Sequence, residues 1–296
     1  MVLGIIGLGV VGSIYACGLA EKGQEVLGYD VCIGQPFFAG KEKLCKEAGV
    51  ELVSGLPELV CRADWVLAVT TCAHAEDLAR DAAVLLRPGQ LYADLSSSIP
   101  AAKLRMRDIV EASGADFVDA CSMGSPLGYG LRNEVAVSGP RAREMAYGLN
   151  SRGMNLTIKG PEVGQAAAFK VLRSIYTKGL EAILVECLST AYAFGIFDQV
   201  FSSICHMMTE DVDALYSRMV RTNVVQSMNR AEEIGDVTGM LRERHLNSIM
   251  ADAAYRKLLW SANCGIKEHF HSATPEHLEE PLAYWASLLS AGQTPE

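Results

Sequence analysis

The chain has 296 residues, of which half are apolar and 21% are charged, so it is long enough for one large or two ordinary domains with a substantial core. Its formal charge of −9 opposes association with a phosphate backbone, which argues against nucleic-acid binding. Its nine cysteines, an odd number without any C-x-x-C pair, argue against a disulfide framework or a zinc knuckle and predict free thiols in a reducing cytoplasm.

Short β-branched runs alternate with helical periodicity up to about residue 160, which is the pattern of βαβ units and a parallel sheet. The predicted strands are, in chain order, Val2–Ile6, Glu25–Tyr29, Trp65–Val69, Gln90–Asp94, Asp116–Asp119, Glu134–Val137 and Leu156–Ile158. The predicted helices between them cover residues 10–21, 73–86, 100–112 and 140–149. Glycines stand where these helices should end.

The character of the sequence changes after Gly160. From Val163 to Phe197 there is no proline, and Ala, Leu and Ile recur at helical spacing, which predicts one helix of about thirty residues. The rest of the chain is expected to be helical to about residue 290. The sequence therefore predicts an α/β domain with a doubly wound parallel sheet over residues 1–161 and an all-helical domain over residues 162–296.

The uncharged residues 1–20 do not have the pattern of a signal peptide or a membrane helix, because no Lys or Arg precedes them and they contain five glycines. A second uncharged run, Cys187–Phe197, is too short to span a bilayer. We therefore expect a soluble cytoplasmic protein without a membrane partner.

A glycine motif follows the first predicted strand and precedes the first predicted helix. Gly7 permits a tight turn, Gly9 lets a pyrophosphate approach the backbone, and Gly12 allows close packing of helix on strand. The N-terminus of the helix then offers N–H groups to the phosphates. With Leu8, Val10 and Val11, these glycines form a predicted dinucleotide-binding loop of the Rossmann type.

Asp30 ends the second predicted strand, eighteen residues after Gly12. A carboxylate in this position accepts hydrogen bonds from ribose hydroxyls and repels a 2′-phosphate. Because no Arg or Lys follows until Lys41, we expect NAD to be preferred over NADP. In the alternative interpretation Asp30 only caps a turn and the glycines serve packing.

The chain resembles the β-hydroxyacid dehydrogenase family, which includes 6-phosphogluconate and 3-hydroxyisobutyrate dehydrogenases. The stretches that carry the resemblance are Ile5–Gly12, Ala93–Pro100, Asp119–Ser125 and Val163–Ser174. The resemblance implies that Ser97 lies beside the nicotinamide, that Thr70 and Thr71 belong to the cofactor site, and that Lys170 is the catalytic lysine. It also implies a homodimer formed through the C-terminal helices.

The departures from the family pattern concern the substrate. The family's Ser-Gly-Gly is replaced by Met123, Gly124 and Ser125, which follow Ser122 in the predicted substrate loop. The Asn that follows the catalytic lysine by four residues is Ser174 here. The best match to the family's C-terminal Ala-Lys-Asp stretch, Ala231-Glu232-Glu233, has no lysine. The chain therefore resembles a divergent branch whose substrate is not set by the resemblance.

Lys170 is the candidate general base for oxidation of an alcohol. A lysine needs desolvation or a neighbouring positive charge to work near neutrality, and its flanking Ala, Phe, Val and Leu residues, with Arg173 nearby, are expected to supply both. On a helix Ser174 lies about 40° and Lys178 about 80° from Lys170, so all three share one face. We expect this face to bind an anionic, oxygen-rich substrate.

The resulting prediction is an NAD-dependent oxidoreductase that acts on a small hydroxy acid, with Lys170 and Ser174 as catalytic residues. Arg173, Lys178 and the loop Ser122–Ser125 are expected to bind the substrate. The histidines near residue 270 fit no zinc template, so no metal is expected. The alternatives are an imine reductase, a class that generally lacks this lysine, and a nucleotide-binding protein without catalytic activity.

Overall fold

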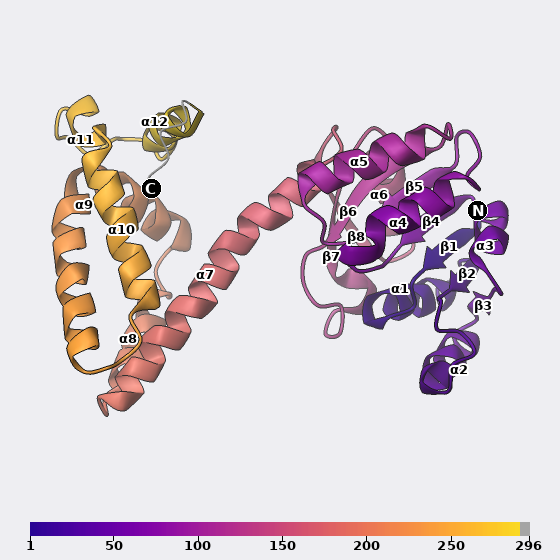
Figure 1. Ribbon diagram of the computed structural model, residues 1–296, viewed down its shortest axis with the longest axis horizontal. Helices are drawn as coiled ribbons and strands as arrows, with labels where there is room; N and C mark the ends of the chain where they lie inside the picture. The colour runs from indigo at the N-terminus through magenta and orange to yellow at the C-terminus, as the bar shows by residue number, and fades with distance from the viewer. Residues whose placement is uncertain (291–296) are drawn as a thin grey trace. The chain divides into compact units, whose positions relative to one another are not determined.

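The computed structural model describes residues 1–290, which divide into two compact units. The first unit contains residues 1–176, and the second begins at Thr177. In Figure 1 the first unit carries the strands and helices up to α6, whereas the second is drawn entirely as helices and loops. Within residues 1–290, no helix combines the length and apolar character needed to cross a bilayer.

One eight-stranded sheet forms the centre of the first unit, with the strand order β3-β2-β1-β4-β5-β6-β7-β8. The strands are β1 Leu3–Ile6, β2 Val26–Tyr29, β3 Glu51–Leu52, β4 Trp65–Ala68, β5 Leu91–Asp94, β6 Asp116–Ser122, β7 Glu134–Ser138 and β8 Asn155–Gly160. All neighbours are parallel except β6 and β7, which pair antiparallel. The seven predicted strands are confirmed, whereas the two-residue β3 was not predicted because it is too short to show a period.

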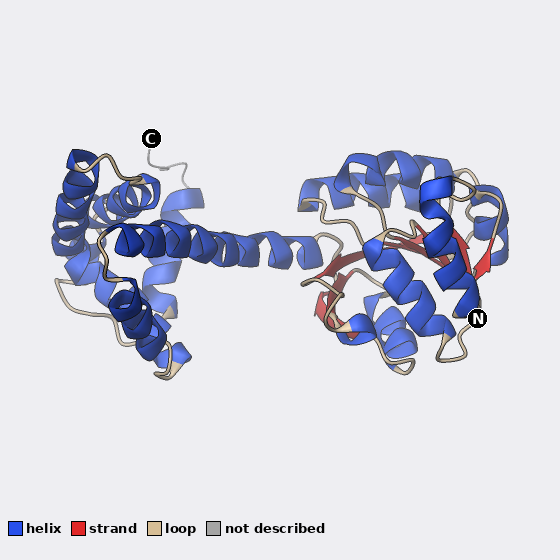
Figure 2. Cartoon of the chain, turned by 90° about the horizontal axis from the view of Figure 1, so that it is seen from below, coloured by secondary structure: helices blue, strands red, loops and turns tan. Residues whose placement is uncertain are grey.

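Helices cover both faces of this sheet, as Figure 2 shows for the red strands between blue helices. The helical segments are α1 Val10–Ala20, η1 Pro36–Phe38, α2 Ala39–Glu47, α3 Leu56–Arg62, α4 Cys72–Ala83, α5 Pro100–Glu111, η2 Gly130–Arg132 and α6 Ala142–Asn150. Side chains of α1, α2 and α6 share one core, and those of α3, α4 and α5 share the other. The predicted doubly wound fold is therefore confirmed. Helices α2 and α3 were not predicted, because α2 buries only Cys45 and shows no apolar stripe and α3 has only seven residues.

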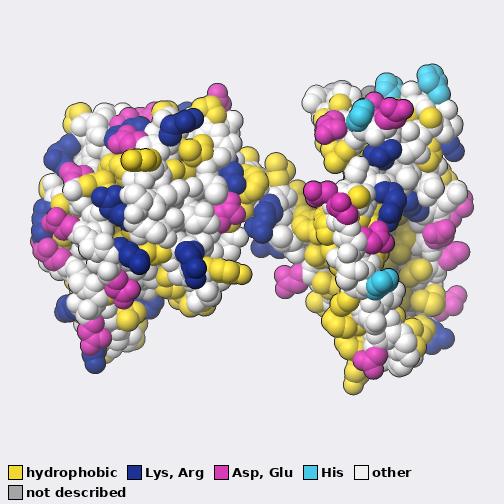
Figure 3. All heavy atoms as spheres, turned by 180° about the vertical axis from the view of Figure 1, so that it is seen from behind, with side chains coloured by type: hydrophobic (Ala, Val, Ile, Leu, Met, Phe, Trp, Pro, Cys, Tyr) yellow, Lys and Arg dark blue, Asp and Glu magenta, His cyan; other side chains and the backbone are white. Residues whose placement is uncertain are grey.

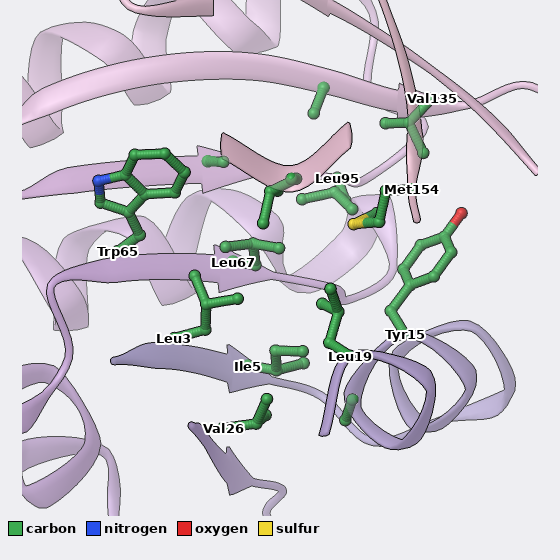
Figure 4. Close-up of a cluster of buried hydrophobic side chains, with 14 of the residues drawn as sticks. Leu3, Ile5, Tyr15, Leu19, Val26, Trp65, Leu67, Leu95, Val135 and Met154 are labelled. Carbon is green, nitrogen blue, oxygen red and sulfur yellow. The ribbon is translucent and has the colours of Figure 1, made fainter. Parts of the chain in front are cut away.

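Alternation along the strands assigns side chains to the two cores. Leu3 and Ile5 point into the core with α1, while the neighbouring Ile6 points into the other core. Figure 4 shows Leu3, Ile5 and Leu67 packed in the first of these cores, together with Tyr15 and other labelled residues. The two cores hold the sheet in place, and the candidate site is built at the ends of its strands.

The second unit consists of helices. They are the C-terminal part of α7 Gln165–Ala193, then α8 Phe197–Met207, α9 Val212–Glu243, α10 Ile249–Asn263, α11 Ile266–His269 and α12 Glu279–Ser290. The helix predicted to continue to Phe197 ends earlier, because Gly195 adopts a φ of +70° and the chain turns into α8. The α10 N-terminus is capped from α7, where the Glu186 carboxylate accepts the N–H groups of Met250 and Ala251 at 2.8 and 2.9 Å.

An apolar groove of about 490 Å³ lies within the second unit, between α7, α8, α9 and α10. Its lining includes the exposed Ile183, Val237 and Met240 and the half-buried Phe194. Figure 3 shows yellow hydrophobic side chains on the surface of this unit. Exposed apolar surface of this kind is characteristic of interaction sites.

Candidate active site

The candidate residues follow one row of strand ends across the sheet. In register, Tyr29, Ile6, Ala68, Asp94 and Asp119 stand side by side on β2, β1, β4, β5 and β6. The first four strands run parallel, and so does β6, so their carboxyl ends meet at the same edge. In open α/β sheets this edge carries the ligand site, beside the point where the strand order reverses.

The loop between β1 and α1 has the local geometry that the glycine motif requires. Gly7 adopts a φ of +90°, and a Cβ there would overlap the backbone carbonyl of Val69. A Cβ on Gly12 would overlap the carbonyl of Gly7, so this glycine lets the helix approach the strand. Gly9 is exposed and faces open space, with no atom of another segment within 4 Å of the point that a Cβ would occupy. A dinucleotide pyrophosphate therefore fits against Gly9.

The first turn of α1 offers N–H groups to this loop. Its N-cap residue is Gly9, which has no side chain to accept from them, and no acidic residue lies in the turn. Such a helix N-terminus attracts phosphate oxygens through its N–H groups and its dipole. Val10 and Val11 begin the helix, and Leu8 is buried beneath the loop.

Asp30 ties the end of β2 to the glycine loop. Its Oδ2 accepts the N–H of Leu8 at 2.7 Å, and its Oδ1 accepts the N–H of Cys32 at 2.9 Å. Each carboxylate oxygen has a second lone pair, so Asp30 keeps acceptor capacity for ribose hydroxyls. It therefore has a structural role besides the one predicted from the sequence.

A pocket of about 340 Å³ opens beside Asp30, between the strand ends and α4. It is lined by Gly7, Asp30 and Thr70, and also by residues that sequence reasoning missed: His74, Asp77 and Asp81. Thr71 precedes α4 as its N-cap residue and is exposed. Three carboxylates at one pocket disfavour any additional phosphate there.

Lys170 and Ser97 meet at the next part of the same edge. Ser97 is exposed in the turn between β5 and α5, and Lys170 lies half-buried in the second turn of α7. The Nζ of Lys170 is 2.6 Å from the Oγ of Ser97. The apolar enclosure expected around Lys170 is only partial, since Phe169 and Leu172 beside it are 38% and 63% exposed.

A buried ionic cluster that sequence reasoning missed lies beneath this pair. Lys103 is completely buried, and its Nζ lies 2.6 Å from Asp94 Oδ2 and 3.1 Å from Asp119 Oδ1. Burial lowers the pKa of Lys103, but Asp94 and Asp119 outweigh it and hold this pKa above its usual range, so Lys103 is charged. One signal was available: Lys103, Met106 and Val110 follow the i, i+3, i+7 spacing of a buried helix face.

The predicted substrate loop starts where β6 ends. The Oγ of Ser122 accepts a hydrogen bond from the Nδ2 of Asn133 at 2.8 Å and lies 3.4 Å from the hydroxyl oxygen of Tyr15. Met123 is held at both ends, because its N–H donates to Glu134 and its carbonyl accepts the Nη1 of Arg173 at 3.0 Å. Sequence reasoning missed Tyr15 and Asn133, which hold this loop in place.

The remaining predicted residues differ in their surroundings. Gly124 and Ser125 are exposed in the loop, and a Cβ on Gly124 would lie 3.3 Å from Asn133 Oδ1. The Oγ of Ser174 donates to the carbonyl of Lys170 at 2.9 Å, so this hydroxyl is engaged within its own helix. Lys178 is exposed on α7 in the second unit. Among residues 1–290, no three His, Cys, Asp or Glu side chains gather as a metal-binding group.

Residues 2–142 match the family of the NAD binding domain of 6-phosphogluconate dehydrogenase. An uncharacterized 28.5 kDa protein of Methanothermus fervidus is 27% identical over 251 residues, which cover 84% of this chain and 94% of that protein.

Two solved structures extend the comparison to most of the chain. A conserved protein of unknown function with structural similarity to 3-hydroxyacid dehydrogenases is 28% identical, covers 90% of this chain and 97% of its own, and superposes with a TM-score of 0.60. An imine reductase from Myxococcus stipitatus in complex with NADP+ is 21% identical, with coverages of 90% and 95% and a TM-score of 0.75. The likeness to the imine reductase is a likeness of fold alone.

Proposed function

We propose that this protein, whose residues 2–142 belong to the family of NAD-binding domains of 6-phosphogluconate dehydrogenase, interconverts the hydroxyl and carbonyl forms of a small anionic hydroxy acid. It is an NAD(P)-binding dehydrogenase or reductase of the 3-hydroxyacid dehydrogenase type. The observation that carries the proposal is the 2.6 Å contact between Lys170 and Ser97 at the sheet edge that also bears the dinucleotide loop.

The cofactor is held by the chain's own groups at this edge. Gly9 and the first turn of α1 bind the pyrophosphate, and Asp30 with Thr70 lines the pocket for the adenosine ribose. When bound, NAD supplies the two-electron acceptor for the alcohol carbon. The carboxylates of Asp30, Asp77 and Asp81 favour NAD over NADP, because a 2′-phosphate would add negative charge beside them.

Lys170 moves the proton of the reacting hydroxyl. In the oxidation direction its neutral amine accepts that proton, and in the reduction direction its ammonium returns it to the carbonyl oxygen. Nζ carries N–H groups in both protonation states, so it can donate to the Ser97 hydroxyl in either, and the neutral amine keeps its one lone pair free for the substrate proton. Ser97 thereby holds Lys170 at the site through the whole proton transfer.

Positive charge beside the loop Ser122–Ser125 supports an anionic substrate. Lys170 and Arg173 lie one turn apart on α7, and Arg173 reaches the carbonyl of Met123 in that loop. A guanidinium in this position can bind a carboxylate with two parallel hydrogen bonds. The replacement of the family's Ser-Gly-Gly leaves Arg173 as the candidate carboxylate-binding group.

An imine reductase is the second candidate function, because the fold of such an enzyme covers 90% of this chain. A Lys170 ammonium could protonate an imine nitrogen as it would a carbonyl oxygen, so the two activities differ in substrate and not in the proton donor. A nucleotide-binding protein without catalytic activity is the third.

The test is a paired screen that follows the absorbance of the reduced nicotinamide. Small 2- and 3-hydroxy acids are offered with NAD, and cyclic imines are offered with the reduced cofactors. We expect turnover with hydroxy acids that is lost in Lys170→Ala and kept in Lys43→Ala, an exposed lysine of the same unit that pairs with Glu47 on α2. Turnover of imines alone would support the second candidate, and cofactor binding without any turnover would support the third.

A further inference from the structure

We propose that Lys103, Asp94 and Asp119 form a positioning unit that holds Lys170 against Ser97. The inference rests on the proposed function of that pair. It concerns groups that do not reach the site themselves, since all three side chains are completely buried. They act through the two segments that carry Ser97 and Lys170.

Asp94 fixes the turn that presents Ser97. The Oγ of Ser96 donates to Asp94 Oδ2 at 2.6 Å, and the Oγ atoms of Ser96 and Ser98 lie 2.8 Å apart. Ser96 and Ser98 are buried, whereas Ser97 between them is exposed. The carboxylate therefore fixes the residues on both sides of Ser97 and leaves its hydroxyl directed to the site.

Asp119 fixes the start of the helix that carries Lys170. Its Oδ2 accepts the N–H groups of Gly164 and Ala167 at 3.1 and 2.9 Å. The Oγ of Ser138 donates to the same oxygen and accepts the N–H of Ala166 at 2.9 Å. A carboxylate bound to the first N–H groups of a helix satisfies them and complements the helix dipole. Lys170 follows Ala167 by less than one turn, so its backbone is placed by this contact.

Lys103 joins the two carboxylates and hence the two segments. Besides both carboxylates, its Nζ lies 2.8 Å from the carbonyl of Asp94 and 3.0 Å from that of Ala120. A buried ion cluster of this kind gains little stability over apolar side chains of similar size, because desolvation opposes the ionic attraction. Its use here is geometric: it fixes the carboxylates of Asp94 and Asp119, which are register partners on β5 and β6, and through them the Ser97 turn and the α7 N-terminus.

The test compares two variants by the reactivity of Lys170. Lys103→Met leaves two buried carboxylates without a cation and is expected to lower the melting temperature. The double variant Lys103→Met, Asp94→Asn removes one positive and one negative charge, so the net charge of the cluster stays unchanged and the fold is expected to survive. The probe is acetylation by acetic anhydride, followed at individual lysines by peptide mass spectrometry over a range of alkaline pH. It needs no substrate, so failure of the proposed reaction leaves this test intact.

We expect acetylation of Lys170 in the double variant to accelerate about fivefold, the worth of one hydrogen bond, with a changed pH profile. Lys43, which pairs with Glu47 on the exposed α2, is the internal control and should react as in the unaltered protein. Once a substrate is in hand, the double variant should lose turnover and keep its Michaelis constant. The proposal is overturned if Lys170 reacts at the unaltered rate and pH profile, or if Lys43 accelerates equally and reports general loosening.

Discussion

The Nζ atom of Lys170 lies 2.6 Å from the hydroxyl oxygen of Ser97, although the two residues are 73 positions apart in the chain. Ser97 follows a strand of the dinucleotide-binding sheet, and Lys170 belongs to the long helix that leaves this unit. The contact joins a residue assigned to the cofactor site with the residue assigned to proton transfer. It is therefore the relationship on which the first predictions depend.

Replacing Lys170 separates proton transfer from cofactor binding. Lys170→Ala should lower turnover by ~10²–10⁴, the typical contribution of a positioned acid–base group, and leave NADH affinity nearly intact. Lys170→Arg should recover little, because a guanidinium stays protonated and cannot accept the proton. Steady-state kinetics and NADH fluorescence titration measure the two effects. Near-normal turnover in Lys170→Ala would remove this residue from the mechanism.

Two serine substitutions form a matched pair around Lys170. Ser97→Ala removes the hydroxyl that contacts Nζ, so turnover should fall by about tenfold, whereas Ser174→Ala removes a hydroxyl engaged with a helix carbonyl and should cost less. Both variants should melt close to the unaltered protein, since neither serine is buried. The order of the two losses in turnover is the decisive quantity. A larger loss of turnover in Ser174→Ala would mean that Ser174 donates the hydrogen bond to the reacting oxygen.

Asp30 should govern the choice between NAD and NADP. Asp30→Asn keeps an acceptor for a backbone N–H and removes the charge, so NADP binding should improve relative to NAD by roughly tenfold, or ~1.4 kcal/mol. Asp30→Ala leaves the N–H groups of Leu8 and Cys32 without this acceptor and should also destabilise the loop. Calorimetric titration with both cofactors gives the ratio. Asp64→Asn makes the same change away from the pocket and should leave the ratio of NAD to NADP affinity unaltered. Tighter binding of NADP than of NAD by the unaltered protein would refute the assignment.

Cys121, beneath the site, should be chemically inert. Burial raises its pKa to about 11, with Lys103 and Lys170 opposing this shift and Asp119 adding to it. A raised thiol pKa means that the reactive thiolate forms only as the pH approaches that value. Near neutral pH iodoacetamide should therefore alkylate the exposed Cys61 and Cys72 and spare Cys121, as read by peptide mass spectrometry. Equal rates at Cys121 and Cys72 would show that the site opens to solvent.

The second unit should pair with a second copy of this chain. Its groove between α7 and α10 has an almost wholly apolar lining, which a partner's helices would remove from water. Light scattering should give a dimer at micromolar concentration. Val237→Asp, which places a charge in the groove, should shift the protein towards monomer, and Asp236→Asn on the neighbouring position should not. A monomer in the unaltered protein would contradict the expectation.

Local patterns predicted most of the first unit. Seven of its strands and four of its helices follow from apolar periodicity, because alternation and 3.6-residue spacing are set by the residues of each segment alone. The roles of Gly7 and Gly12 were also predictable, since a turn with φ above zero and a close helix–strand approach each require a residue without Cβ. The motif around Lys170 was recognisable from the sequence because its residues lie in one continuous stretch.

Only the tertiary structure decided which distant residues meet. The contact of Lys170 with Ser97 and the burial of Lys103 between Asp94 and Asp119 depend on the order in which β5, β6 and α7 are placed. The antiparallel β7 and the helix α2 likewise depend on neighbours that their own sequences do not specify. Periodicity states which side of a segment is buried, but the partner across the interface is chosen by packing of the whole chain. For that reason the sequence by itself determined the nucleotide-binding fold and the lysine helix, and the tertiary structure decided what holds that lysine in place.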